Sequence, residues 1–260
     1  SASQGQGHHT FIAQIVAETL AVSLEDIVFE SGDTGKFPHG VGTIGSRIAV
    51  NVGPSAYEAA NAVKDKAIKL ASETLEAAEQ DLELSSGKVQ VKGVEDLSVS
   101  LGDLARTLSP KAGGKVPSGF VPSLEATSYT GSNGSPFASG TNVAEVEVDI
   151  LTGNVKLINY SVAHDCGTII NPKIVDGQII GGVVHGIGNA LFERMIYSEG
   201  GQPLTNTYAD YLLPLATEMP NIEIVHEESA SPLNVLGIKG AGEGGTIPAT
   251  AAVVAAVENA

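Results

Sequence analysis

Apolar residues recur at helical spacing along several stretches of the chain. The stretches are His8–Leu20, Pro54 to about Gln80 and Ile174–Phe192, and the second has proline near its start, where the first turn of a helix tolerates it. The alanine- and valine-rich run Pro248–Asn259 completes the set. These patterns predict four helices, of which the last is apolar.

Other stretches alternate between apolar and polar residues. The alternation over Val143–Ile150 and Val155–Val162, on either side of the turn Thr152-Gly153-Asn154, predicts a β-hairpin with one face exposed to water. A shorter hairpin is predicted around Ser86-Gly87, and Ile27–Phe29 is predicted to be a strand.

The stretch Ser109–Gly140 is dense in glycine, proline and serine, as loops between structural units are. We therefore expect an α+β chain of two subdomains, each of mixed sheets with helices. The predicted subdomains are residues 1–122 and 123–260.

Composition excludes several classes of partner and site. Thirty acidic against fourteen basic residues give a net charge of -16, which argues against nucleic acid as a partner. The one cysteine, Cys166, excludes an internal disulfide and any multi-cysteine metal site contributed by this chain alone. No apolar run approaches the roughly 20 residues of a membrane span, and the first residues lack the order of a signal peptide. We expect a cytoplasmic protein, and because Ser1 is not methionine we expect a processed or truncated chain.

Glycine is concentrated in four clusters: GQG at 5–7, GVGTIGSR at 40–47, GQIIGG at 177–182 and GAGEGG at 240–245. Five glycines fall in the predicted helix at 174–192, where each costs about 1 kcal/mol relative to alanine, so close packing or a closely bound ligand is needed to explain them. The clusters also carry polar groups suited to phosphates and heterocycles, including a guanidinium at Arg47. From spacing alone, one shared ligand site and four unrelated loops are equally good interpretations.

Four ordered motifs, spread over nearly the whole chain, resemble one family. They are GQGHHTFIAQIVAE, GDTGKFPHGVGTIGSR, the long stretch from VEVDILTGNV through HDCGTIINPKIVDGQ to GNALFE, and SPLNVLGIKGAGEGGT. The chain resembles the C-terminal, molybdopterin-binding portion of the large subunit of molybdenum hydroxylases, the family of xanthine dehydrogenase, aldehyde oxidase and aerobic carbon monoxide dehydrogenase. The resemblance implies the C-terminal half of that large-subunit fold.

The resemblance also implies roles for individual residues. It makes Glu243 the active-site glutamate, a base that accepts a proton while the substrate is hydroxylated with water as the oxygen source. The residues implied to bind the cofactor are Gln6, Gly7, Thr43, Gly45, Ser46, Arg47, Cys166, Thr168, Asn171, Gln178 and Gly242. In the family, molybdenum is held by the pterin dithiolene and by no protein side chain, so no metal ligand is expected in this chain.

Cofactors and partners follow from the same resemblance. The expected cofactor is molybdopterin with molybdenum, as its cytosine dinucleotide, and the expected substrate is an aldehyde, an N-heterocycle or a related small carbon compound. Two [2Fe–2S] clusters and FAD are expected on an iron–sulfur subunit and a flavin subunit, because one cysteine cannot ligate a cluster. The N-terminal half of the large subunit, or a separate chain supplying it, is expected as a further partner.

Other interpretations remain open at this point. A non-catalytic fragment or interaction module could keep the fold and bind no cofactor on its own, and a generic phosphate-binding protein is a more distant alternative. The run His164-Asp165-Cys166 could suggest a thiol hydrolase, but adjacent residues on an extended segment point to opposite faces and make a poor nucleophile–base pair. Lys239 could orient a phosphate or lie in solvent, and Glu243 could be an ordinary surface carboxylate.

Overall fold

The computed structural model describes residues 1–40, 42–109 and 116–260. The chain divides into two compact units, of which the first comprises Ser1–Ser3, Gly7–Val41 and Asn51–Ser132. The second comprises Gln4–Gln6, Gly42–Val50 and Asn133–Ala260. Residues 42–50 thus group with the second unit, whereas the predicted boundary at 122/123 placed them in the first subdomain. The subdomain boundary itself stays a prediction.

Helix α1, His8–Leu20, has the predicted bounds. Helix α2 spans Ile48–Leu75, so it begins before Pro54 and ends sooner than the predicted Gln80. It ends where Glu76 adopts a left-handed backbone with φ of 51°. The predicted strand at Ile27–Phe29 is wrong, because this stretch follows the short helix η1 (Leu24–Asp26) as irregular chain and pairs with no described strand.

A three-stranded sheet lies in the first unit. Strands β1 (Leu82–Ser85) and β2 (Lys88–Val91) form the predicted hairpin, and Ser86 and Gly87 both have the positive φ that a two-residue hairpin turn requires. The helix η2 (Glu79–Asp81) precedes this hairpin, and β3 (Val94–Ser100) and α3 (Leu101–Thr107), which were not predicted, follow it. The core residues that these elements share with α2 are Ala67, Leu70, Ala71, Leu82, Val89, Leu104 and Leu108.

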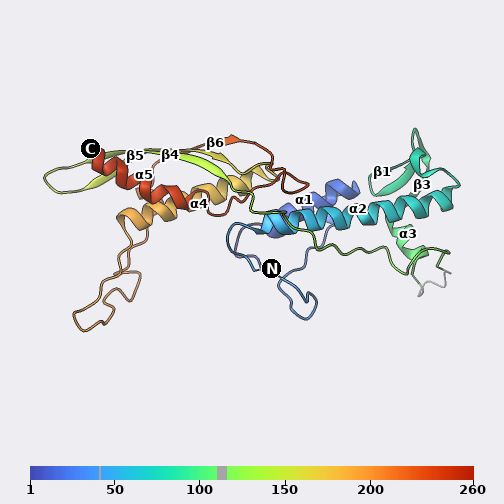
Figure 1. The fold of residues 1–260 in the computed structure, drawn as a ribbon, viewed down its shortest axis with the longest axis horizontal. Helices are drawn as coiled ribbons and strands as arrows, with labels where there is room; N and C mark the ends of the chain where they lie inside the picture. Colours follow the sequence, from blue (N-terminus) through green and yellow to red (C-terminus); the bar gives the residue numbers. More distant parts are fainter. Residues whose placement is uncertain (41, 110–115) are drawn as a thin grey trace. The chain divides into compact units, whose positions relative to one another are not determined.

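The second unit is a sheet with helices against one face (Figure 1). Strands β4 (Ser139–Val148) and β5 (Val155–Asp165) form the long antiparallel hairpin that the alternation predicts. Strand β6 (Ile222–Glu227), which was not predicted, pairs parallel to β5. A parallel neighbour needs a crossover connection, and α4 lies in that connection.

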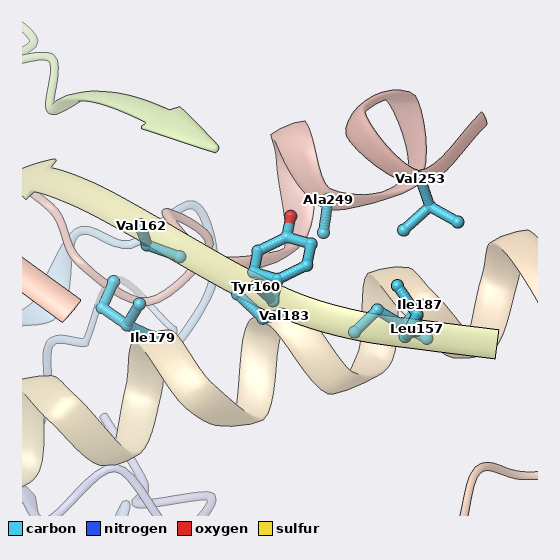
Figure 2. Packing of buried hydrophobic residues seen from close by; sticks show 8 residues of the cluster. All are labelled: Leu157, Tyr160, Val162, Ile179, Val183, Ile187, Ala249 and Val253. Carbon is cyan, nitrogen blue, oxygen red and sulfur yellow. The ribbon is translucent and has the colours of Figure 1, made fainter. Parts of the chain in front are cut away.

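Helices α4 (Pro172–Leu191) and α5 (Thr246–Asn259) form where helices were predicted, and the short η4 (Ala216–Glu218) lies between them. Figure 2 shows how β5, α4 and α5 contribute to one core, with the Tyr160 ring at its centre. The buried members of this core are Leu157, Tyr160, Val162, Ile179, Val183, Ile187, Ala249 and Val253. None of the helices in the described ranges combines the length and hydropathy needed to cross a bilayer.

Two of the α4 glycines are explained by close packing against α5. A Cβ placed on Gly186 would lie 2.5 Å from the Ala249 Cβ, and one on Gly182 would lie 2.8 Å from the Thr246 nitrogen. Both neighbours belong to α5, so these glycines let the two helix backbones approach. Gly177 and Gly181 have no such neighbour within 4 Å, and packing gives no account of them.

Candidate functional site

Glu243 and Ser46 form a reciprocal pair, although they lie far apart in sequence. The Ser46 hydroxyl donates to the Glu243 carboxylate, Oγ to Oε2 2.6 Å, and accepts a hydrogen bond from the Glu243 N–H at 3.0 Å. Glu243 is exposed, and both residues belong to the second unit. The carboxylate predicted to be catalytic is therefore accessible, and its orientation is fixed by a hydroxyl predicted to bind the cofactor.

The loop at 42–47 has an unusual backbone. Gly42, Gly45 and Ser46 all have positive φ, at 74°, 62° and 55°, and such conformations turn successive N–H groups toward one side, where they can bind an anion. A Cβ on Gly45 would meet nothing within 4 Å, so the space beside it is open. The Arg47 side chain is tied to this loop through Nε, which donates to the Gly42 carbonyl at 3.3 Å. The loop has the donors and the space that a phosphate group needs.

The chain just before the Glu243 turn is joined to the DCGT segment. The Lys239 N–H donates to the Cys166 carbonyl at 2.7 Å, and the Thr168 N–H donates to the Gly237 carbonyl at 3.1 Å. A Cβ on Gly167 would lie 2.2 Å from the Gly237 oxygen, so only glycine permits this approach. The DCGT segment and the chain just before the GAGEGG cluster thus meet through their backbones.

A sheltered ion pair strengthens the same junction. Lys239 Nζ lies 2.7 Å from Asp165 Oδ2, and the two side chains are 13% and 15% exposed. Ser229 takes part through its hydroxyl, which accepts from Lys239 at 2.7 Å and donates to Asp165. Lys239 is therefore a structural group that pairs with Asp165, and it does not lie free in solvent. The sequence contained the charges, but only the fold shows that they meet.

The network changes the acidity of Asp165. Burial alone raises the pKa of this carboxyl, but hydrogen bonds from Lys239, from the Ser229 hydroxyl and from the N–H groups of Gly167 and Ser229 outweigh burial and hold the pKa well below its usual range. Asp165 is thus an ionised structural group at neutral pH.

Cys166 is 3% exposed, and burial together with the Asp165 charge raises the pKa of its thiol to about 11. It is therefore a protonated thiol at neutral pH and a poor nucleophile. The neighbouring His164 is 2% exposed, and burial first, then the nearby His226, lower its pKa. Neither His164 ring nitrogen has a hydrogen-bond partner among the described residues. This geometry offers no thiol–imidazole pair for a hydrolase.

The His164 ring instead packs against the Glu243 turn. A Cβ placed on Gly244 would lie 2.2 Å from His164 Nε2, and one on Gly245 would lie 2.2 Å from the Ile179 carbonyl oxygen of α4. Side chains are therefore excluded directly after Glu243, and the turn is seated on the core.

The remaining predicted residues are placed as follows. Gln6 exchanges hydrogen bonds with Gln4 on its own loop, and Gly7, at the start of α1, is the one predicted residue that groups with the first unit. Asn171 caps α4 by accepting from the Ile174 N–H at 3.0 Å. Gln178 lies half-buried on α4. Thr43 lies in the 42–47 loop, and Gly242 faces Ser46, whose Oγ would be 3.4 Å from an added Cβ.

Comparison with known proteins decides the family. A family model described as a molybdopterin cofactor-binding domain matches residues 1–220. The chain belongs to the molybdopterin cofactor-binding domain family. The predicted resemblance is thereby confirmed.

Relatives with curated functions are large subunits of molybdenum hydroxylases. The nicotine 6-hydroxylase large subunit of Paenarthrobacter nicotinovorans is 42% identical over 258 residues, which cover 99% of this chain and 32% of the relative. The carbon monoxide dehydrogenase large chain of Hydrogenophaga pseudoflava is 38% identical over 256 residues, 97% of this chain and 31% of the relative. The chain thus spans about a third of the length of these relatives.

Solved structures confirm the predicted α+β fold. A reconstituted CO dehydrogenase from Oligotropha carboxidovorans aligns with a TM-score of 0.90 at 34% identity, covering 100% of this chain and 32% of that one. Quinoline 2-oxidoreductase from Pseudomonas putida 86 aligns with a TM-score of 0.87 at 41% identity, covering 98% of this chain and 32% of that one.

The residues of the second unit fit the cofactor that names this domain family. The 42–47 loop offers left-handed backbone and a guanidinium beside open space, which suits a phosphate-bearing group. Within the described part of the chain, no group of three or more His, Cys, Asp or Glu side chains could hold a metal ion.

Proposed function

We propose that this chain is the molybdenum-cofactor-binding part of a multi-subunit oxidoreductase that hydroxylates a small carbon substrate, with water as the oxygen source. The substrate class we infer is an aldehyde, an N-heterocycle or a related compound, and relatives named for nicotine, quinoline and carbon monoxide support it. The observation that carries the proposal is the accessible Glu243 carboxylate, oriented by Ser46 within a turn whose glycines exclude other side chains.

Two sets of residues would hold the cofactor. At the phosphate end, Thr43, Gly45 and Arg47 provide donors and space, and Arg47 can engage a phosphate through two parallel N–H groups. We infer the cytosine dinucleotide form, because a second phosphate and a nucleotide give this loop a ligand of matching chemistry. The other residues that we propose to line the cofactor are Gln6, Gly7, Cys166, Thr168, Asn171, Gln178 and Gly242.

The proposed chemistry needs a proton acceptor. When bound, the molybdenum cofactor supplies the oxidising centre at which the substrate carbon gains an oxygen derived from water. Glu243 accepts the proton that this oxygen gives up, and a positioned base of this kind contributes about 10²–10⁴-fold in rate. The glycines around Glu243 keep its surroundings free of side chains that would hinder a bulky ligand.

Electron transfer requires partners. With Cys166 as its one cysteine, this chain cannot supply the four ligands of a [2Fe–2S] cluster. We therefore propose that an iron–sulfur subunit and a flavin subunit carry the clusters and FAD. The portion of the relatives that this chain does not span, or a separate chain equivalent to it, would complete the large subunit.

Glu243→Gln in the assembled enzyme tests the proposed base. Glutamine keeps the shape of the side chain but cannot accept the proton, so the damage should fall on the chemical step and not on cofactor binding. We expect the single-turnover rate of molybdenum reduction by substrate, per bound molybdenum, to fall about 10²-fold or more. Molybdenum content should stay near that of the wild type.

Glu199→Gln is the matched control, because Glu199 is an exposed carboxylate elsewhere in the same unit. It should leave both quantities unchanged. A Glu243→Gln enzyme that reduces its metal at the wild-type rate would remove Glu243 from the mechanism. Loss of molybdenum together with activity would assign Glu243 to cofactor binding instead.

A further inference from the structure

The Ser46 hydroxyl has its only proton committed to Glu243. A serine hydroxyl offers one donor and two acceptor positions. Here the donor goes to Glu243 Oε2 at 2.6 Å, and one acceptor position is used by the Glu243 N–H at 3.0 Å. In this arrangement the Ser46 hydroxyl has no proton left to donate to the cofactor, although the sequence resemblance implies that Ser46 binds it.

The backbone of Ser46 supports a role tied to its side chain. Its φ of 55° is left-handed, a region that favours glycine, and the residue before it is glycine. A loop that served only as a backbone cradle would accept glycine at 46 as well. The presence of serine in a conformation that is costly for it indicates that the hydroxyl is needed.

Ser46 is also placed firmly against the turn that carries Glu243. A Cβ on Gly240 would lie 2.7 Å from the Ser46 carbonyl oxygen and 2.8 Å from the Ser46 Cβ. The 42–47 loop and the 240–245 turn are therefore in direct backbone contact. This contact sets the distance between the hydroxyl and the carboxylate.

We propose that Ser46 is a positioning residue that acts through Glu243. It restricts the exposed and otherwise flexible glutamate side chain to one orientation, with the carboxylate kept as a proton acceptor. This inference rests on the proposed role of Glu243 as the base. It reassigns Ser46 from binding the cofactor to orienting the proton-accepting carboxylate.

A double-mutant cycle in the assembled enzyme tests the proposal. Ser46→Ala should lower the single-turnover rate of molybdenum reduction about tenfold, with molybdenum content near wild type, whereas in the Glu243→Gln background it should cause no further loss. Ser46→Gly should match Ser46→Ala, because glycine suits the left-handed backbone and the two variants share only the loss of the hydroxyl.

Hydrogen exchange gives a second readout that does not depend on turnover. Since the Glu243 N–H donates to Ser46, Ser46→Ala should speed amide exchange in the peptide that spans Glu243. The proposal would be overturned if Ser46→Ala lowered the single-turnover rate equally in the wild-type and Glu243→Gln backgrounds, or if it reduced the molybdenum content. It would also be overturned if Ser46→Ala changed neither the rate nor the amide exchange. A wild-type rate in Glu243→Gln alone would instead overturn the proposed function, and this inference with it.

Discussion

Two glycine-rich segments of the second unit use glycine for opposite reasons. In GAGEGG, at 240–245, added side chains would strike Ser46, His164 and the α4 backbone at 2.2–2.8 Å. In the loop at 42–47, Gly45 has open space around it, and its φ of 62° is what requires glycine. Gly240, Gly244 and Gly245 of the first segment are closely packed, whereas the space beside Gly45 in the second is open.

This difference distinguishes the structural role of the 240–245 segment from the proposed ligand-binding role of the 42–47 loop. A turn seated on the core can hold a catalytic carboxylate in place, because no movement is possible without disturbing α4 and β5. A loop with a guanidinium beside it and open space next to Gly45 can receive a cofactor. Sequence alone showed two similar clusters, and the packing around each one distinguishes them.

The largest expected effect tests the packed segment. A Cβ in Gly245→Ala would lie 2.2 Å from the Ile179 carbonyl oxygen and 2.9 Å from the Val183 nitrogen, both in the α4 backbone. Since neither can move without shifting the helix, we expect the free energy of unfolding to fall by at least about 3 kcal/mol. Thermal or denaturant unfolding of the purified protein measures this change.

Gly181→Ala is the matched control, because Gly181 is helical and its added Cβ would have no neighbour within 4 Å. It should stabilise the protein by about 0.5–1 kcal/mol through helix propensity. Similar behaviour of the two variants would contradict the distinction between packed and open glycines.

The next effect concerns the ion pair that holds the packed segment to β5. Lys239→Met should cost about 3 kcal/mol, because it leaves Asp165 sheltered and without its cation. Lys36→Met breaks a pair whose side chains are 55% and 56% exposed, and it should change stability by less than about 1 kcal/mol. Equal losses in the free energy of unfolding for the two variants would show that the sheltered pair stabilises the fold no more than the exposed pair does.

The pH dependence of the same pair has a definite sign. The folded state holds the pKa of Asp165 below its usual range, so the stabilisation is fully present above the unfolded-state value of about 4 and is lost as the pH falls through the lower folded-state value. Lys239→Met should therefore show a shallower loss of stability than the wild type below about pH 4. Parallel acid unfolding curves would contradict this account.

The smallest effect tests the open loop. Arg47→Ala should weaken cofactor binding about tenfold, since one charge-assisted contact to phosphate is lost, while the fold stays intact. Molybdenum and nucleotide content of the assembled enzyme provide the measurement. Arg106→Ala, which removes an exposed arginine from the first unit, should leave both unchanged. Full occupancy in Arg47→Ala would show that the phosphate site lies elsewhere.

Local patterns predicted the regular elements well. Helix α1, the long hairpin β4–β5 and helices α4 and α5 follow from apolar periodicity, because each buries one face on its neighbours. Strand β6 was missed, and its parallel pairing with β5 is a long-range contact that no local pattern identifies. The false strand at 27–29 has the composition of a strand but no neighbour, and Val28 is 86% exposed.

Long-range contacts within the site could not be predicted for the same reason. The sequence motifs identified Glu243 and Ser46 as candidate site residues. Their hydrogen bonds to each other could not be predicted, because the two residues lie far apart in the sequence. The sequence likewise did not show that Lys239 and Asp165 form an ion pair, which is seen only in the fold. The roles of the predicted cofactor residues stay predictions, since side-chain identity does not show which groups face a ligand.

The most direct test of the central claim is the cofactor content of the protein purified from its native host. The claim is that this chain, together with its partners, holds a molybdopterin cofactor beside Glu243. Metal analysis and analysis of the nucleotide released by acid treatment should find molybdenum and a cytosine nucleotide in equal amounts. Protein that contains neither would contradict the claim and identify the chain as a module that keeps the fold without the cofactor.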